Sequence, residues 1–427
     1  MNLSKKNEKR RPVGIDLFSG AGGLSLGFEQ AGFDIAAAVE IDPVHCAVHE
    51  YNFPITKTIC ASVADITGDQ IRQRANLGDL DIDVVFGGAP CQGFSLIGKR
   101  VLHDPRNQLV FHYVRLINEL KPKYFVFENV KGLTVGKHAH FLTELIRTLG
   151  ETGYHVLTPY QVLNAADYGV PQDRQRLFLI GARHGFSLPE YPEKLDRNIT
   201  VWEGIGDLPN ADDFAELLIS DSVRTEWTTA AEYGLQLRGL VAEPKNYGYN
   251  RLFDVHALTS SLRTEHTKTI QSRFLSTDQG RTEEISRFRK LAPGGLCNTL
   301  RAGTDSARGA FTSARPIHPI YPRVITVREA ARLHSYPDWF RFHSTKWHGF
   351  RQIGNSVPPL LGRAVASQII KALQVTPSKP DAILYSGNSK LLSYDMSEAS
   401  KIFCVPYTTI ARRQRTVPHI NSETAAL

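Results

Sequence analysis

Residues 82–95, IDVVFGGAPCQGFS, decide how this chain folds. They begin with a short apolar run rich in β-branched side chains, which predicts a buried strand. Glycines follow the strand, and Pro90 stiffens the approach to Cys91. Because open α/β folds bind ligands outside the carboxyl ends of strands, the pattern predicts a thiol at a functional sheet edge. A Pro-Cys pair alone is more often a tight turn with a buried cysteine, so the surrounding motifs have to decide.

The composition sets the class of protein. The chain has 427 residues, with 42% hydrophobic and 22% charged side chains, which is ordinary for a soluble globular protein. That length allows a large core and two domains with appendages. Since there is no long apolar run and no signal peptide pattern, we expect no membrane partner. The five cysteines form no CxxC pair, which argues against a zinc site and favours a reducing, cytoplasmic setting.

The net charge of +7 suggests a polyanionic partner, and it is unevenly distributed. Residues 187–243 carry four Lys or Arg against twelve Asp or Glu. The balance reverses to eight against five over residues 251–290, and to nine against three over residues 301–351. We therefore expect phosphate contacts in the last third of the ordered chain.

A glycine-rich turn joins the first predicted strand to the first predicted helix. Residues 13–18 are typical of a strand, the turn 19–23 has the sequence SGAGG, and residues 24–31 are helical. A second strand, residues 35–39, ends in Glu40, about twenty residues past the glycines, where an acid can accept from both hydroxyls of a ribose. No lysine follows the glycines as in a phosphate-binding loop, so the pattern favours a nucleoside cofactor, S-adenosylmethionine.

Asp65 follows a short predicted strand, residues 56–60. Its carboxylate can accept from an adenine amine. The alternative, a cap on a helix over residues 68–75, is equally compatible with the sequence.

Further along the chain, helix 107–120 precedes a strand over residues 124–127 that ends in Glu128. This places a carboxylate at the same sheet edge as the cysteine. After helix 139–150 and strand 154–163, the chain returns to this edge.

Two arginines, Arg174 and Arg176, lead into a strand over residues 177–180. Because side chains alternate along a strand, the two point the same way if the segment is extended. They can bind a phosphate, or hold a base carbonyl as a fork. The alternative is an ordinary surface pair.

Alternating strands and helices over residues 13–182 predict an α/β fold with a doubly wound parallel sheet. From Phe186 this alternation fails, and residues 187–324 are irregular. A helix then begins at Thr326, which forms a capping box with the acid three residues on. A last helix follows residues 354–359 and ends near Leu373.

Together these motifs resemble the DNA (cytosine-5) methyltransferases, of the stand-alone prokaryotic modification methylase type. They come in the family's order and at its spacings across residues 13–183 and 291–373. One match is moderate evidence, whereas eight in series are specific. The matching segments are residues 18–23, Glu40, Asp65, residues 90–95, residues 128–130, Gln172-x-Arg174-x-Arg176, residues 326–337 and residues 354–357.

The resemblance implies that the protein methylates carbon 5 of a flipped-out cytosine in a specific DNA duplex. Cys91 would add to the base, protonated Glu128 would donate to ring nitrogen 3, and Arg176 would hold the ring carbonyl. Arg174 would support the loop and a backbone phosphate. Residues 93–101 would close over the base, whose extrusion costs a few kcal/mol.

The resemblance also implies a binding set for S-adenosylmethionine and no metal. Phe18 would stack on the adenine, Glu40 would take the ribose, and Asp65 the adenine amine. The methionine side would be closed by Asn355 and Val357. The full set is Phe18, Gly20, Gly22, Gly23, Glu40, Ile41, Asp65, Ile66, Pro90, Asn355 and Val357.

The family's fold implies a mostly parallel sheet with one reversed strand near its edge and a smaller inserted domain. We assign residues 1–186, completed by residues 352–375, to the catalytic and cofactor-binding domain. Residues 187–325 would form the target-recognition domain and residues 326–351 a hinge segment. Base specificity is expected in the recognition domain, with its basic half from Arg251 onward nearest the DNA.

The expected partner is double-stranded DNA, bound by a monomer in a bacterial cytoplasm, with functional pairing to a restriction endonuclease left open. One alternative is an RNA cytosine-5 methyltransferase, which the long segment between Arg176 and Thr326 disfavours. Another is a catalytically dead DNA-binding regulator, which the intact Cys91, Glu128 and Arg176 disfavour.

The resemblance does not cover the tail, residues 376–427. We expect a linker over residues 375–395 and then two short helices, one capped by Ser397 and the other starting near Pro406. Their spacing is similar to a helix-turn-helix that would offer Thr408, Thr409, Arg412 and Arg413 to DNA. The alternative, slightly favoured, is a basic amphipathic tail that packs on the catalytic domain.

Overall fold

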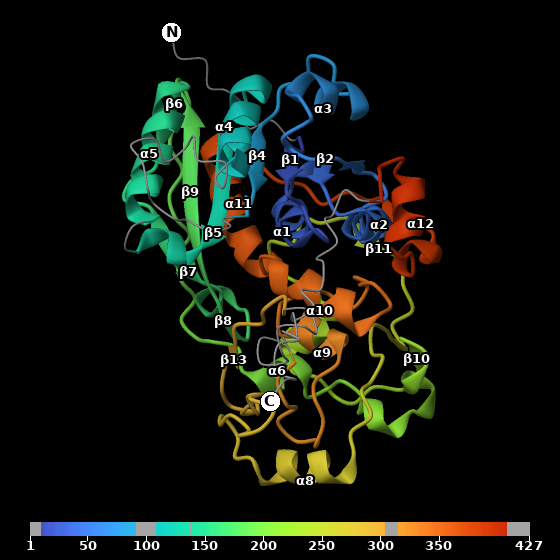
Figure 1. The fold of residues 1–427 in the computed structure, drawn as a ribbon. Helices are drawn as coiled ribbons and strands as arrows, with labels where there is room; N and C mark the ends of the chain where they lie inside the picture. Colours follow the sequence, from blue (N-terminus) through green and yellow to red (C-terminus); the bar gives the residue numbers. More distant parts are fainter. Residues whose placement is uncertain (1–9, 91–107, 136–137, 304–314, 408–427) are drawn as a thin grey trace, which may run out of the picture.

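The computed structural model describes residues 10–90, 108–135, 138–303 and 315–407. It has a large body built on one sheet and a smaller body below it in Figure 1. Cys91, the closing segment 93–101 and the tail from Thr408 lie outside the described residues.

The large body is organised on a sheet of eight strands in the order β3-β2-β1-β4-β5-β9-β6, with β7 also paired to β9. Its strands are β1 (Val13–Leu17), β2 (Asp34–Glu40), β3 (Lys57–Cys60), β4 (Val84–Gly87), β5 (Tyr124–Val130), β6 (Tyr154–Val156), β7 (Gln161–Asn164) and β9 (Gln175–Arg183). Strands β1 to β5 pair in parallel. Strand β9 runs antiparallel to β5, β6 and β7, so it is the one reversed strand. The predicted fold class is confirmed, although the strand expected over residues 154–163 is divided into β6 and β7.

The strand order reverses between β1 and β4, where the chain returns to the middle of the sheet. Open α/β sheets bind ligands at such a switch point, outside the carboxyl ends of the strands. The glycine-rich turn after β1 and the segment leading to Cys91 after β4 both leave the sheet at this point.

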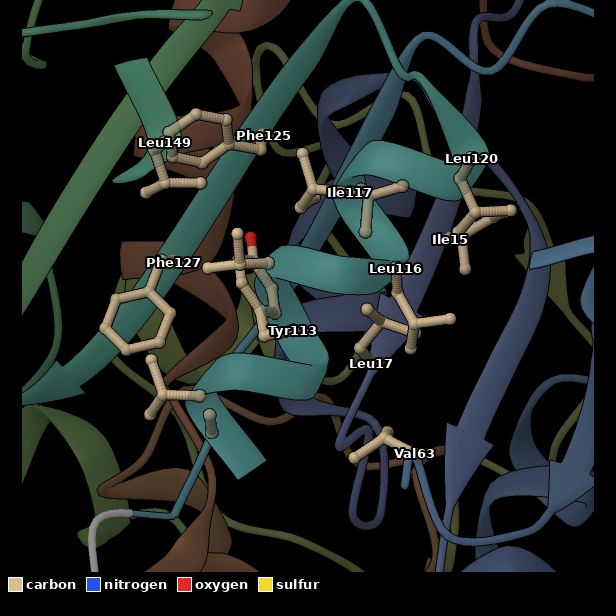
Figure 2. Packing of buried hydrophobic residues seen from close by; sticks show 14 of the residues in the cluster. Ile15, Leu17, Val63, Tyr113, Leu116, Ile117, Leu120, Phe125, Phe127 and Leu149 are labelled. Carbon is tan, nitrogen blue, oxygen red and sulfur yellow. The ribbon is translucent and has the colours of Figure 1, made fainter. Parts of the chain in front are cut away.

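Helices cover both faces of this sheet. The larger helices of this body are α1 (Gly23–Ala31), α2 (Pro43–Asn52), α3 (Gly68–Arg74), α4 (Gln108–Leu120), α5 (His138–Glu151) and α11 (Pro359–Leu373). Figure 2 shows Tyr113, Leu116 and Ile117 of α4 packed between side chains of β1 and β5. On the opposite face, α1 and the C-terminal helix α11 share a second apolar core. The C-terminal helix therefore returns to the large body, as expected.

The smaller body has little regular structure. Its elements are α6 (Val201–Ile205), β10 (Val223–Arg224), α7 (Glu232–Leu237), β12 (Ala257–Leu258), α8 (Lys268–Ser276), β13 (Cys297–Asn298), α9 (Val327–Arg332) and α10 (Lys346–Asn355). One apolar core joins residues from α6, α9 and α10. The expected hinge, residues 326–351, is therefore built into this body. Helix α9 begins with the predicted capping box of Thr326 and Glu329.

One stretch of the expected recognition domain packs on the large body instead. The buried guanidinium of Arg251 forms an ion pair with Glu29 of α1, with 2.8 Å between Nη2 and Oε2. Tyr249 donates its hydroxyl to Asp34. Arg251, which we expected near the DNA, is therefore committed to a contact between segments.

The C-terminal segment expected to be a linker is docked. Strand β14 (Ile383–Leu384) pairs in parallel with β11 (Asn250–Arg251), and Leu392 is buried against Ala21 and Val48. Helix α12 (Met396–Ile402) lies beside α2 in Figure 1 and is capped by Asp395, not by Ser397 as predicted. Among the described residues, no helix has the length and apolarity to span a membrane.

Candidate active site

The turn after β1 is held by the carboxylate at the end of β2. Glu40 accepts from the backbone N–H of Gly20 through Oε2 and from that of Asp42 through Oε1, both at 2.9 Å. Phe18, at the start of the turn, has a φ of 62°. An ionised carboxylate has about four lone-pair sites, so Glu40 keeps acceptor capacity for a ligand.

The loop after α10 lies directly on the start of α1. A Cβ added to Gly23 would stand 2.4 Å from the carbonyl oxygen of Val357, so only glycine fits there. Val357 is buried, whereas Asn355 is exposed. The structure thus brings together the turn and the loop that the sequence assigned to the cofactor.

The residues expected around the adenine differ in exposure. Ile41 is 37% exposed beside Glu40, while Ile66 is buried. Asp65 is exposed and does not cap the following helix, because Thr67 forms the capping box of α3 with Gln70. The helix-cap alternative for Asp65 is therefore wrong.

Glu128 lies over the backbone that leads to Cys91. Strands β4 and β5 are paired, and a Cβ added to Gly88 would stand 2.4 Å from Glu128 Oε2. Asn129 donates its side-chain amide to the carbonyl of Ala89 at 2.9 Å. The end of β5 therefore fixes the segment up to the exposed Pro90, the last residue described before the cysteine.

Glu128 and Arg176 form a largely buried ion pair at this edge. Arg176 Nε lies 2.9 Å from Glu128 Oε1, because the antiparallel pairing of β5 and β9 places Arg176 opposite Val130. Burial raises the pKa of Glu128, and the neighbouring Arg176 and Arg174 oppose that shift. Burial also lowers the pKa of Arg176. The site thus favours a neutral carboxyl more than an exposed glutamate would.

Arg174 has a different setting from the one predicted. It is fully buried and donates to three backbone carbonyls, those of Leu300, Gly354 and Ser356, each at 2.7 Å. It therefore cannot reach a DNA phosphate, and that expected role is corrected. Its guanidinium bonds both to Leu300 of the smaller body and to the end of α10 and the loop after it, which lies beside the glycine-rich turn. Neither arginine belongs to a surface pair.

Two neighbours of Arg174 complete a buried polar network. Gln172 donates to the carbonyl of Leu333 and to His334 Nδ1, and accepts from the N–H of Leu300. Burial holds the pKa of His334 well below its usual value. The ring is therefore neutral, and its Nε2–H donates to the carbonyl of Ser356 at 3.2 Å.

The sequence prediction missed His334 and Asp16. Asp16 is buried in β1, where burial raises its pKa to about 8. Its Oδ2 accepts from the Ser25 hydroxyl at 2.6 Å, while Oδ1 has no hydrogen-bond partner among the described residues. An acid inside an apolar strand was the available signal. His334 lies inside the matching segment 326–337, but its partners are distant in sequence, so the segment did not indicate its contacts.

No group of His, Cys, Asp or Glu side chains within the described ranges could hold a metal ion. The described part of the site is thus a carboxyl-arginine pair, a glycine-rich turn and a carboxylate at the end of β2. All three lie at the carboxyl edge of the sheet, on strands β1, β2, β5 and β9.

Residues 13–371 match the family model described as C-5 cytosine-specific DNA methylase. The type II methyltransferase M.XorII of Xanthomonas oryzae pv. oryzae is 62% identical over 407 residues, which cover 95% of this chain and 96% of that protein. M1.HphI of Haemophilus parahaemolyticus is 33% identical, over 84% of this chain and 86% of its own length.

Solved structures show the same fold. A DNA modification methyltransferase encoded within an E. coli prophage superposes with a TM-score of 0.70 at 34% identity, covering 85% of this chain and 99% of that one. The Dnmt2 methyltransferase of S. pombe superposes with a TM-score of 0.52 at 16% identity, over 85% of this chain and 99% of its own. At that identity the likeness concerns the fold alone.

Proposed function

The chain belongs to the C-5 cytosine-specific DNA methylases, and from this premise we propose that it methylates a flipped-out cytosine in a specific duplex sequence. The observation that carries the mechanism is the Glu128–Arg176 pair. Its carboxylate lies against Gly88, three residues before the cysteine that would attack the base.

Cys91 is the proposed nucleophile. Carbon 5 of cytosine is a poor nucleophile, and addition of the Cys91 sulfur to carbon 6 makes the ring enamine-like. The ring then carries negative charge at nitrogen 3 unless it gains a proton there. After methylation, loss of the carbon 5 proton to a base allows the carbon–sulfur bond to break and the thiolate to leave.

Glu128 would supply the proton for nitrogen 3. A carboxyl group can donate only in its neutral form, and burial raises the pKa of Glu128. Arg176 opposes that shift, yet it also fixes the carboxyl through Nε. Its remaining N–H groups would bind the carbonyl oxygen of the ring.

The residues at the glycine-rich turn fit S-adenosylmethionine, which when bound supplies an electrophilic methyl group. Gly20 has a φ of 54° and open space where a side chain would stand, so a ligand can approach the backbone. Glu40 would bind the ribose hydroxyls and Asp65 the adenine amine, with Phe18, Ile41, Ile66 and Pro90 around the ring. Val357 and Asn355 would close the methionine side.

Duplex DNA is the proposed substrate, and the irregular body between β9 and α9 supports this. RNA is the alternative, but residues 187–325 provide room for a part that reads duplex sequence. A dead regulator is disfavoured because Glu128 and Arg176 are paired at the edge. We also propose a restriction endonuclease as functional counterpart, because M.XorII is named as a type II methyltransferase.

The experiment is methyl transfer by the purified protein to duplex DNA and to transfer RNA, followed by nucleoside analysis. Bisulfite sequencing of DNA from cells that express the protein then gives the sequence methylated. We expect 5-methylcytosine in one duplex sequence and none in transfer RNA. Methylation of transfer RNA alone would overturn the DNA assignment, and no product with either substrate would overturn the enzymatic one.

A further inference from the structure

Residues 279–290 of the smaller body form a hairpin. Its two arms exchange backbone hydrogen bonds, including those that pair Gly280 with Lys290 and Glu283 with Phe288. Because opposite residues share a face, Glu283, Phe288 and Lys290 lie on one side, and Thr282 and Arg289 on the other. The first side faces the protein: Phe288 packs on Phe274 and Ile317. The second side is exposed.

Buried charges make this hairpin rigid. The Glu283 carboxylate accepts from the backbone N–H groups of Ile285 and Ser286, at 3.2 Å and 2.6 Å, and lies 3.3 Å from Arg273 Nε. Lys290 Nζ donates to the carbonyls of Phe274 and Leu275 at the end of α8. The tip is therefore held by hydrogen bonds on its inner side and keeps its shape without a ligand.

Three arginines of the hairpin are exposed and form no ion pair within the described part of the chain: Arg281, Arg287 and Arg289. Two other exposed arginines of this body are paired, Arg197 with Glu203 and Arg224 with Asp254, whereas Lys268 and Arg301 form no ion pair among the described residues. The exposed acids Glu284, in the hairpin, and Asp278, just before it, do not pair with the arginines. Unpaired guanidinium groups on a rigid scaffold are typical of a surface that binds phosphates.

The tip presents two kinds of side chain together. Ile285 is 65% exposed at the tip. Arg287 stands two residues on, with a φ of 60° and its N–H bonded to the carbonyl of Glu283. An aliphatic group matches the thymine methyl, and an arginine fork matches O6 and N7 of guanine.

We propose that this hairpin enters the major groove of the DNA, where Ile285 and Arg287 read base edges and Arg281 and Arg289 contact phosphates. A two-stranded ribbon has the width that the major groove admits. The inference rests on the proposed function and deepens it, since it identifies the residues that determine the target sequence.

The chain path supports the placement. After the hairpin, β13 (Cys297–Asn298) pairs with β8 (Gln172–Asp173), directly before Arg174 and Arg176. Contacts made by the hairpin are thus linked, through one short strand pair, to the edge that carries the Glu128–Arg176 pair.

The test uses the full chain, an unmethylated duplex that carries the target sequence, and a set of duplexes that each change one base pair of that sequence. Arg287→Gly suits the positive φ and removes the fork. We expect this variant to lose about 10- to 100-fold of its kcat/KM discrimination at one position of the site. Arg287→Lys, which keeps the charge, should lose discrimination equally and keep the salt dependence of binding.

Arg281→Gln and Arg289→Gln should weaken binding to all duplexes alike, and each should reduce the slope of log K against log salt by about one. The matched control, Arg224→Gln, removes a paired arginine of the same body and should change neither quantity. Unchanged cofactor binding by all variants would show that each is folded.

If Arg287→Gly keeps the wild-type discrimination at every position, the reading role is wrong. If wild type methylates no duplex, the proposed function fails, and the salt slopes then test the hairpin by themselves. Unchanged slopes in both glutamine variants would overturn its contact with DNA.

Discussion

The arginines at the sheet edge are largely buried and bonded within the protein, whereas the arginines of the hairpin are exposed and form no ion pair among the described residues. Arg174 is fully buried and bonded to three carbonyls, and Arg176 pairs with Glu128. Arg281, Arg287 and Arg289 are exposed and form no ion pair in the part of the chain that the structure describes. In the first region the guanidinium groups bond to acceptors within the protein, whereas in the second they remain available to a partner.

This difference predicts different costs of mutation. A buried cation that bonds to backbone carbonyls leaves them without donors when it is removed, and each such group costs about 1–3 kcal/mol. An exposed arginine without a partner contributes little to folding, so its loss should appear only in binding.

The largest expected effect is on the chemistry at the sheet edge. Glu128→Gln keeps the size of the side chain but cannot give up a proton, and we expect kcat to fall about 10²- to 10⁴-fold. Single-turnover methylation with saturating DNA would measure it. The control, Glu151→Gln, changes an exposed acid on α5 and should leave kcat unchanged. Equal kcat in wild type and Glu128→Gln would remove Glu128 from the mechanism.

The pH dependence sharpens the same point. Burial raises the pKa of Glu128 against the opposition of Arg176, so the neutral form persists to higher pH than in an exposed glutamate. Both the activity and the stability that depend on this neutral form are present at low pH, and they are lost as pH rises through the folded pKa. Glu128→Gln should lack this loss of stability with rising pH in urea unfolding, while a loss equal to that of wild type would contradict the assignment.

Replacing an arginine should change the free energy of unfolding far more at the sheet edge than on the hairpin. Arg174→Met should lower the free energy of unfolding by about 3 kcal/mol or more, because three carbonyls lose their donor. Arg289→Met, the matched exposed change, should stay within about 0.5 kcal/mol. Urea titrations of both variants would measure this. Equal effects would show that the two settings do not differ energetically.

Cofactor affinity should show the smallest effect. Glu40→Ala removes the proposed acceptor for the ribose, and we expect S-adenosylmethionine to bind about 1.5–3 kcal/mol more weakly by calorimetry. DNA affinity should stay unchanged, in contrast to the hairpin variants. An unaltered cofactor affinity would exclude Glu40 from the binding set.

The fold could be predicted from the sequence because its signals are local. Apolar runs such as residues 82–86 identify single strands. Glu40 ends its strand as expected, whereas β5 continues two residues past Glu128. Their meeting at one edge follows from the parallel sheet. Thr326 and Glu329 likewise predicted their own capping box.

Contacts between distant segments could not be predicted. The partners of Arg174 lie 126 to 182 residues further along the chain, so nothing near it distinguished a clamp from a phosphate contact. Arg251 lies 222 residues from Glu29, and it was counted as free charge for that reason. Composition alone also suggested a linker where Leu392 is buried. In each case the contacts of the side chain depend on tertiary packing, which the residue type alone does not predict.

The most direct test of the central claim is capture of the covalent intermediate at Cys91. The wild-type protein, with S-adenosylmethionine and its target duplex containing 5-fluorocytosine, should form a complex that resists denaturation, because the fluorine prevents release of the thiolate. Peptide mapping should place the DNA on Cys91, and Cys91→Ala should form no such complex. A resistant complex formed by Cys91→Ala would contradict the account.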